Sequence, residues 1–462
     1  MAIIAGTLSR IKSNPLHCLG GSQRVNEHFA SAGHVWRQRV LDPATTLSLF
    51  ILQVLHGNTA ITHLRHLSKV TVAASSYCAA RARLPLEALA QLVELVCCDG
   101  IRSIQGAISG PALWLGRRIV LADGTTAAAP DTPELQRRWP QPSVQRAGCG
   151  FPVVKLLGAL DLASGMILHL TMMSLGSHEM SQLAGLHGAL RSGDVLLADR
   201  GFCSFAHLAL LSLFPVDAVF RMHQRQIVDF TPHRPHRGNA GKKRRRGMPT
   251  SRYVRKLGAE DHIVQWVKPT QRPRWMDAAI YAALPATVLV RELRYRITTR
   301  GMRTRVVTVA TTLLNEMRYP KRRIAELYGL RWEVETNFRH LKQSMGMEKL
   351  KCKSPDGIAR ELIIFVLVYN LVRAAMTQAA QRQGVADINR VSFMDALRRL
   401  RCLVETELGW LPGDSAVDLI VNPIRPERYH PRVKKRRMKE YDLMNRPRRD
   451  YPEPSELQTV TA

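Results

Sequence analysis

Two short apolar runs that each end at an aspartate constrain the fold of this 462-residue chain more than any other feature. The run 119–122 stops at Asp123, and the run 195–198 stops at Asp199. A short apolar run is typical of a buried strand, and a charged residue directly after it is typical of the point where a strand emerges at the edge of a sheet. The sequence therefore predicts a sheet with two aspartates at neighbouring strand ends.

The segments between and after these runs predict the rest of the sheet. Residues 153–160 and 166–173 are strand-like runs separated by a turn, which predicts a hairpin. Residues 179–191 carry apolar side chains at helical intervals, and 217–222 predict a fifth strand. The order strand, strand, strand, helix, strand is the one that a ribonuclease H-like core requires.

The charge of the chain indicates a polyanionic partner. The sequence has 67 Lys and Arg against 37 Asp and Glu, a net charge of +30, with basic runs at 242–246 and 432–439. Nucleic acid is the leading partner, because cations along a phosphate backbone release condensed counterions. A membrane surface is the rival. We expect no membrane and a cytoplasmic, nucleoid-associated location, because we find no apolar run of roughly 20 residues and no secretory signal.

The fold class that follows is α/β, with a ribonuclease H-like catalytic core whose mixed sheet is flanked by helices, a β-rich insertion domain, and helical terminal regions. Five predicted parts result: a helical N-terminal DNA-binding region (1–105), the first part of the core (106–223), the β-rich insertion (224–314), the second part of the core with a glutamate-bearing helix (315–380), and a helical C-terminal region with a basic tail (381–462). The eight cysteines are scattered, so we expect reduced thiols, mostly buried, and no zinc site.

The segment YGLRWEVETNFRHLK carries the most specific signal. At about 100° per residue, Tyr328, Arg331, Glu335 and Lys342 share one narrow helix face. An adjacent apolar stripe predicts packing on a sheet, and it comprises Leu327, Leu330, Val334, Phe338, Leu341 and Met345. An amphipathic helix with intrahelical ion pairs remains an alternative that needs no catalysis.

The three carboxylates come from separate elements, which is what a two-metal site demands. Asp123, Asp199 and Glu335 supply the hard oxygen ligands that Mg²⁺ prefers, and Mn²⁺ could substitute. Two such ions would activate an attacking hydroxyl and stabilise the leaving 3′-oxygen. Arg331 and Lys342 would hold the scissile strand.

These residues resemble the insertion element 4 family of bacterial transposases. The helix matches the family's Y-x2-R-x3-E-x6-K signature, and the blocks LADGTT and LADRGF agree in order, so the resemblance covers about 121–351. It implies that Asp123, Asp199 and Glu335 are the catalytic DDE triad and that Tyr328, Arg331 and Lys342 contact DNA near the cleavage point.

The resemblance further implies a DNA transposase that cleaves the ends of an insertion sequence and joins them to target DNA. Its partners would be double-stranded DNA, as terminal inverted repeats and target, and a second copy in a homodimeric synaptic complex. Two alternatives stay open: a transposase-derived DNA-binding protein without cleavage, and a metal-dependent nuclease without strand transfer.

Four further residues have no assigned role at the site. Family members often use a tryptophan of the insertion to hold a flipped base, but neither Trp266 nor Trp275 aligns with it by motif, so we expect both to pack in the core. Trp332 lies beside the signature without an assigned role. Glu179 is expected to be a first-turn helix charge.

Overall fold

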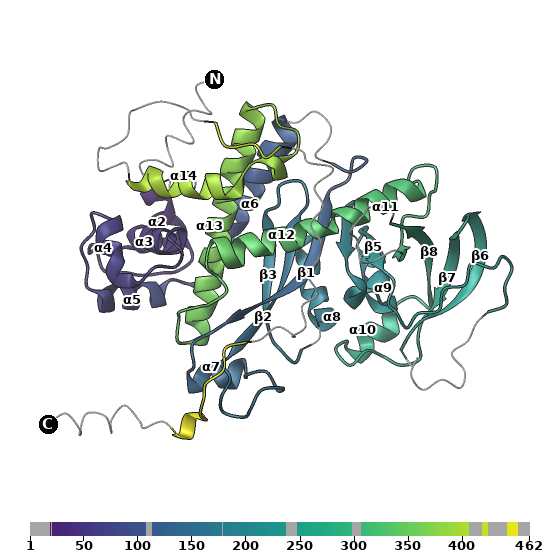
Figure 1. Ribbon diagram of the computed structural model, residues 1–462, viewed down its shortest axis with the longest axis horizontal. Coiled ribbons are helices and arrows are strands. Elements are labelled where there is room, and N and C mark those ends of the chain that lie inside the picture. The colour runs from purple at the N-terminus through teal and green to yellow at the C-terminus, as the bar shows by residue number, and fades with distance from the viewer. Residues whose placement is uncertain are drawn as a thin grey trace.

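The computed structural model describes residues 19, 21–107, 113–177, 179–236, 247–297, 306–405, 418–423 and 441–450. Both basic runs of the sequence, 242–246 and 432–439, lie outside the described residues. The described residues form a mixed α/β structure built on one sheet with helices on both sides (Figure 1).

The sheet has nine described strands in the order β3-β2-β1-β4-β5-β9-β8-β7-β6. The first five are β1 (Ile119–Ala128), β2 (Val153–Asp161), β3 (Ile167–Ser174), β4 (Val195–Ala198) and β5 (Asp217–Arg221). Strand β1 pairs antiparallel with β2 and parallel with β4, while β2 and β3 form the predicted hairpin and β4 pairs parallel with β5. This order fits the ribonuclease H-like core that the sequence predicts.

Four more strands extend the same sheet. They are β6 (Thr250–Gly258), β7 (Asp261–Val267), β8 (Thr287–Arg296) and β9 (Val306–Thr311), and helix α10 (Ala278–Ala283) lies between β7 and β8. Strand β9 pairs antiparallel with β5, so the β-rich segment continues the core sheet at its far end (Figure 1). The predicted boundaries of an insertion domain stay a prediction.

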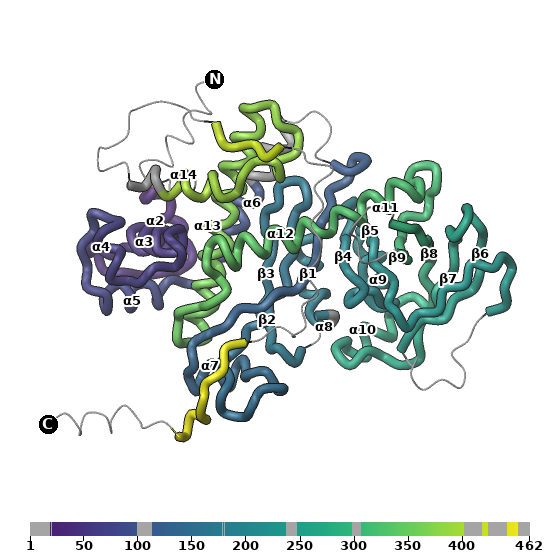
Figure 2. The backbone as a smooth tube through the Cα atoms, in the orientation of Figure 1, coloured from purple at the N-terminus to yellow at the C-terminus, as the bar shows by residue number. Residues whose placement is uncertain are grey.

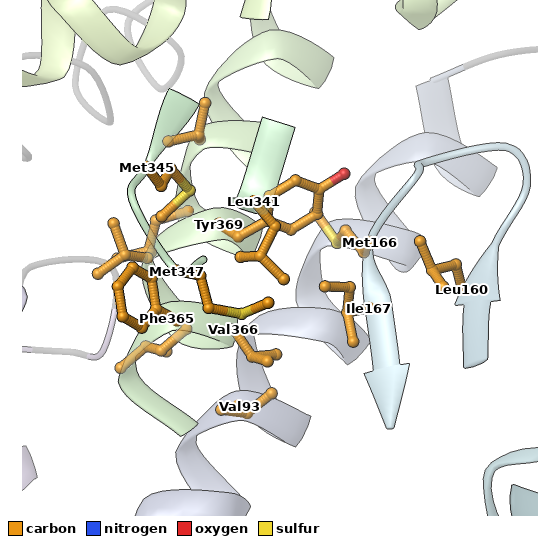
Figure 3. Close-up of a cluster of buried hydrophobic side chains, with 14 of the residues drawn as sticks. Val93, Leu160, Met166, Ile167, Leu341, Met345, Met347, Phe365, Val366 and Tyr369 are labelled. Atoms are coloured by element: carbon orange, nitrogen blue, oxygen red, sulfur yellow. The ribbon is translucent and has the colours of Figure 1, made fainter. Parts of the chain in front are cut away.

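Alternation along each strand divides the core between the two faces of the sheet. Ile119 and Leu121 belong to a cluster with α6 (Leu86–Ala107) and α13 (Pro355–Arg382), whereas Val120 and Ala122 pack with α9 (Phe205–Leu213). Figure 3 shows part of the first cluster, in which Val93, Ile167, Leu341, Phe365 and Tyr369 meet from distant parts of the sequence. Because Asp123 is two residues beyond Leu121, it belongs to the face covered by this cluster.

The N-terminal helices lie beside α13 at one end of the molecule (Figure 2). They are α2 (Gly21–Ser31), α3 (Pro43–Leu55), α4 (Leu64–Leu67) and α5 (Ala74–Arg83). Asp42 caps α3 by accepting from the amide of Thr45 at 2.7 Å. Asn58 donates to the buried Glu361 of α13 at 2.6 Å, which fixes these helices against the core.

Two expectations about helices were wrong, and the one about the thiols is confirmed. Helix α13 is long and apolar enough to span a membrane by length and composition, although the sequence was expected to contain no such run. However, 83% of its most apolar 18-residue stretch is buried inside the protein. Residues 179–191 form only the short α8 (Glu179–Gln182), followed by a 3₁₀ helix at Leu183–Ala189. The free thiols of the described residues are mostly buried, as expected.

Candidate active site

Asp199 directly follows the last residue of β4, as the sequence predicts, but Asp123 lies inside β1, so the prediction that this strand ends at Asp123 was wrong. Strand β1 continues to Ala128 because its antiparallel pairing with β2 goes on after its parallel pairing with β4 has ended at Ala122. Ala122 of β1 pairs in parallel register with Ala198, the last residue of β4, and Asp123 and Asp199 directly follow this pair. Leu121 and Leu197 both pack in the same core cluster. By strand alternation the two carboxylates therefore leave the sheet on that face.

The signature helix is less regular than a uniform period of 3.6 residues. It consists of α11 (Lys321–Gly329), a 3₁₀ turn at Leu330–Trp332, α12 (Glu333–Arg339) and a π-helical turn at His340–Ser344. Five members of the predicted apolar stripe are buried, but Leu330 is 46% exposed. Its placement in the stripe was wrong, because the 3₁₀ turn has three residues per turn and breaks the assumed spacing.

Arg331 and Tyr328 join the helix to the acidic residues. The Arg331 guanidinium donates through Nη1 to Asp123 Oδ2 at 3.2 Å and through Nη2 to Glu335 Oε1 at 3.3 Å. The Tyr328 hydroxyl donates to Asp199 Oδ1 at 3.2 Å. Five of the six residues singled out in the sequence are thus brought together, although they span more than two hundred positions of the chain.

Lys342, the sixth, lies in the π-helical turn. Its Nζ is 3.8 Å from Glu348 Oε1, and its side chain is mostly buried. Lys342 therefore lies further along the helix than Tyr328, Arg331 and Glu335 and makes its ion pair with Glu348 instead. A π-turn at this point is notable, because such turns are often found at functional sites.

Burial controls the protonation of the central groups. It raises the pKa of Asp123 to about 6, and the nearby carboxylates of Glu179 and Glu335 add to the rise, while Arg331 and the Gly124 amide oppose it. That amide donates to Asp123 Oδ1 at 2.8 Å. Burial, together with Asp199, also raises the pKa of Tyr328, which therefore remains a neutral hydrogen-bond donor.

Sequence reasoning considered Glu179 only as a helix charge or a catalytic residue and did not predict how closely its carboxylate approaches β1 on the side away from Arg331. Glu179 does stand in the first turn of α8 as expected, but a Cβ added at Gly124 would lie only 2.4 Å from its Oε1. Lys155 of β2 pairs with Glu179 at 3.3 Å. The glycine after Asp123 was the one signal that something approaches the strand closely here.

Arg221 was also missed, since nothing in the sequence connects it to the aspartates. Its Nη1 lies 4.0 Å from Asp199 Oδ1, because β5 is the strand next to β4. This places a second cation beside Asp199.

The three tryptophans differ in environment. Trp266 is buried in the core, as expected, and donates through Nε1 to Glu292 Oε1 at 2.8 Å. Trp275 is half-buried and packs against the same core cluster, with its ring stacked on that of His207 at 4.8 Å between ring centres. Trp332 is 38% exposed, and the Arg331 guanidinium lies 5.5 Å from its ring centre. It is a neighbour of the site at the surface.

The acidic residues provide the right donors for a divalent cation, but they are not closed around one. Carboxylate oxygens are the ligands that hard divalent ions prefer. In the described part of the chain no three His, Cys, Asp or Glu side chains are close enough together to hold an ion. The cation that Asp123 and Glu335 now share is the guanidinium of Arg331.

Comparison with known proteins gives three similarities. A family model described as "Transposase DDE domain" matches residues 114–371, which include all six site residues. The chain is 26% identical over 340 residues to the transposase InsG for insertion sequence element IS4 of Escherichia coli (strain K12), with 71% of this chain and 70% of that protein covered. It also aligns with the cryo-EM structure of a piggyBac transposase synaptic complex with hairpin DNA, at a TM-score of 0.40 and 10% identity over 88% of this chain and 82% of that one.

Proposed function

We infer that Asp123, Asp199 and Glu335 perform the chemistry of this chain, which belongs to the transposase DDE domain family. The chain is a DNA transposase, an enzyme that cleaves and joins DNA strands, and its family generally uses divalent metal ions. The family does not by itself say which residues act or how. The assignment of the three acidic residues is therefore our proposal.

The observation that carries this proposal is the double contact of Arg331. One guanidinium joins Asp123, within β1, to Glu335, on a helix that follows more than two hundred residues later. Asp199 reaches the same place through Tyr328. Three carboxylates from three elements are the donor set that a pair of divalent cations requires. We propose two Mg²⁺ ions, with Mn²⁺ as a substitute.

The chain's own residues hold the reacting groups. When bound, the two ions would supply charge for the attacking and the leaving oxygens of an in-line displacement. Asp123, Asp199 and Glu335 hold these ions, while Arg331, Tyr328 and Lys342 hold the phosphates on either side of the cleavage point. Arg331 suits this role because its planar fork matches two phosphate oxygens.

The proposed substrate is double-stranded DNA, both as the element's terminal inverted repeats and as target. A basic groove in the N-terminal helices supports DNA contact by the region 1–105. It has a volume of about 760 Å³ and is lined by Arg37, Arg39 and Arg83, together with Trp36 and several small or apolar residues. Arginines beside apolar side chains suit a DNA backbone and its minor groove.

We further propose that two copies act as a homodimer that synapses two element ends, that 224–314 serve as the insertion domain, and that the protein works in the cytoplasm, at the nucleoid when bound to DNA. The chain's likeness to an insertion sequence transposase over most of its length supports this assignment.

The test uses protein, labelled DNA carrying the element's ends, and Mg²⁺. The proposed function predicts cleaved and joined products, whereas the two alternatives predict binding only or cleavage only. Single changes of Asp123, Asp199 or Glu335 to alanine should abolish both products and leave DNA binding largely intact. Cleavage that survives in any of these variants refutes the assignment of that residue.

A further inference from the structure

The Arg331 side chain has an unusual position for a residue expected to bind DNA. It is 9% exposed, and both of its terminal nitrogens face carboxylates of the chain itself. Its Nε is buried and has no hydrogen-bond partner within the described residues. The guanidinium is therefore held at two of its three nitrogens, and the third remains unsatisfied.

The two carboxylates that Arg331 contacts are two of the three that are proposed to hold the metal ions. The single positive charge of a guanidinium between Asp123 and Glu335 attracts both carboxylates, so it holds together two like charges that would otherwise repel each other. A divalent cation placed at the same oxygens would be repelled by the guanidinium, so the two cations compete. Asp199 is outside this contact, since Tyr328 and Arg221 lie against it.

We propose that Arg331 is an exchangeable cation of the acidic site: it holds Asp123 and Glu335 together in the DNA-free protein, and a DNA phosphate must draw it away before divalent ions bind there. This inference rests on the proposed function of the three carboxylates. Arginine forms a bidentate pair with phosphate as readily as with carboxylate. The partly exposed ring of Trp332, already 5.5 Å away, lies at the surface toward which the guanidinium can move.

The consequence is an order of binding. A protein that meets metal ions before DNA keeps its carboxylates paired with Arg331, and only a protein that has engaged DNA offers them to metal. DNA and metal must then strengthen each other's binding, because coupling between two sites is reciprocal.

The experiment measures Mn²⁺ binding to the full-length chain by the loss of the free-ion electron paramagnetic resonance signal. In the Arg331→Gln variant, the Mn²⁺ affinity should rise roughly tenfold or more above that of the unchanged protein. A double-stranded oligonucleotide, corrected for the Mn²⁺ that it binds alone, should raise the affinity of the unchanged protein by a similar factor. In the variant the same oligonucleotide should add little.

Arg221→Gln is the matched control, because it also removes one positive charge beside the acidic residues, but Arg221 lies against Asp199 and does not join Asp123 to Glu335. It should change the affinity much less than Arg331→Gln. If Arg331→Gln binds Mn²⁺ no better than Arg221→Gln, the exchange is refuted. Should Arg331→Gln fail to fold, the oligonucleotide effect on the unchanged protein decides, and its absence overturns the inference.

Asp123→Asn separates this inference from the proposed function. If it abolishes Mn²⁺ binding while Arg331→Gln gives no gain, the metal site stands and the exchange does not. If Asp123→Asn leaves Mn²⁺ binding unchanged, the assignment of the metal ligands itself is wrong, and the inference that depends on it is lost as well.

Discussion

Replacing Asp123 by asparagine is expected to stabilise the metal-free protein near neutral pH, although it removes a residue assigned to catalysis. Burial, more than any other cause, raises the pKa of Asp123 from 3.8 to about 6. A carboxyl whose pKa is higher in the folded than in the unfolded chain favours folding only while it is protonated. Its ionisation above pH 6 therefore lowers the free energy of unfolding.

The size of the effect follows from the same values. A rise of the pKa from 3.8 to about 6 corresponds to about 3 kcal/mol at pH 7.5. This is an upper bound, because 22% of the Asp123 side chain is exposed to screening solvent. Asparagine cannot ionise, so the stabilisation should be present above pH 6, shrink between pH 6 and pH 4, and be absent below pH 4.

The assay is denaturant unfolding in the presence of a chelator, followed by tryptophan fluorescence from pH 4 to pH 8. Glu134→Gln is the control, because it removes one negative charge from an exposed position and should have little effect at any pH. Equal stability of Asp123→Asn and the unchanged protein at pH 7.5, or a gain that persists at pH 4, would refute the reasoning.

Three further changes probe other parts of the structure. Lys342→Ala should weaken DNA binding and make the slope of log affinity against log salt concentration about one unit less steep. An unchanged slope in titrations at several salt concentrations would contradict a phosphate contact. Gly124→Ala should push the Glu179 carboxylate off β1, because the new Cβ would lie 2.4 Å from Oε1. We expect Gly124→Ala to lower the cleavage rate about 10-fold at unchanged DNA affinity. Adding Glu179→Ala to this variant should cause no further loss, and an additive loss would show that Gly124→Ala does not act through Glu179. Asp261→Asn should lower the free energy of unfolding by about 3 to 5 kcal/mol, because it removes the counter-charge of the buried Arg291 guanidinium. That guanidinium now donates to the two Asp261 carboxylate oxygens at 2.8 and 2.6 Å. An unchanged thermal unfolding midpoint would contradict this prediction.

Much of the core could be predicted because it depends on local patterns. A short apolar run indicates a buried strand wherever the chain goes afterwards, so the positions of β1 and β4 and the end of β4 before Asp199 were predicted, whereas β1 continues past Asp123 to Ala128. The hairpin of β2 and β3 was predicted for the same reason. The spacing of Tyr328, Arg331 and Glu335 placed all three on one side of a helix, and each contacts the acidic group or belongs to it.

The irregular parts of the signature helix could not be predicted from a uniform period. Leu330 becomes exposed because the helix tightens to a 3₁₀ turn at the position where it passes the acidic residues. The apolar α13 looks like a membrane span by composition, and only its burial among the other elements identifies it as a core helix. In both cases packing against distant segments decides which side chains are buried, and the local sequence does not specify that packing.

The sequence by itself determined where the buried strands β1 and β4 would lie and which helix face would be polar, since these depend on side-chain type and on neighbours a few positions away. Only the tertiary structure decided that Arg331 would join Asp123 to Glu335, that Glu179 would approach Gly124 from the other face of β1, and that β9 would extend the core sheet through β5. Each of these contacts joins segments tens to hundreds of residues apart. Their geometry follows from how strands and helices pack together, which no local pattern contains.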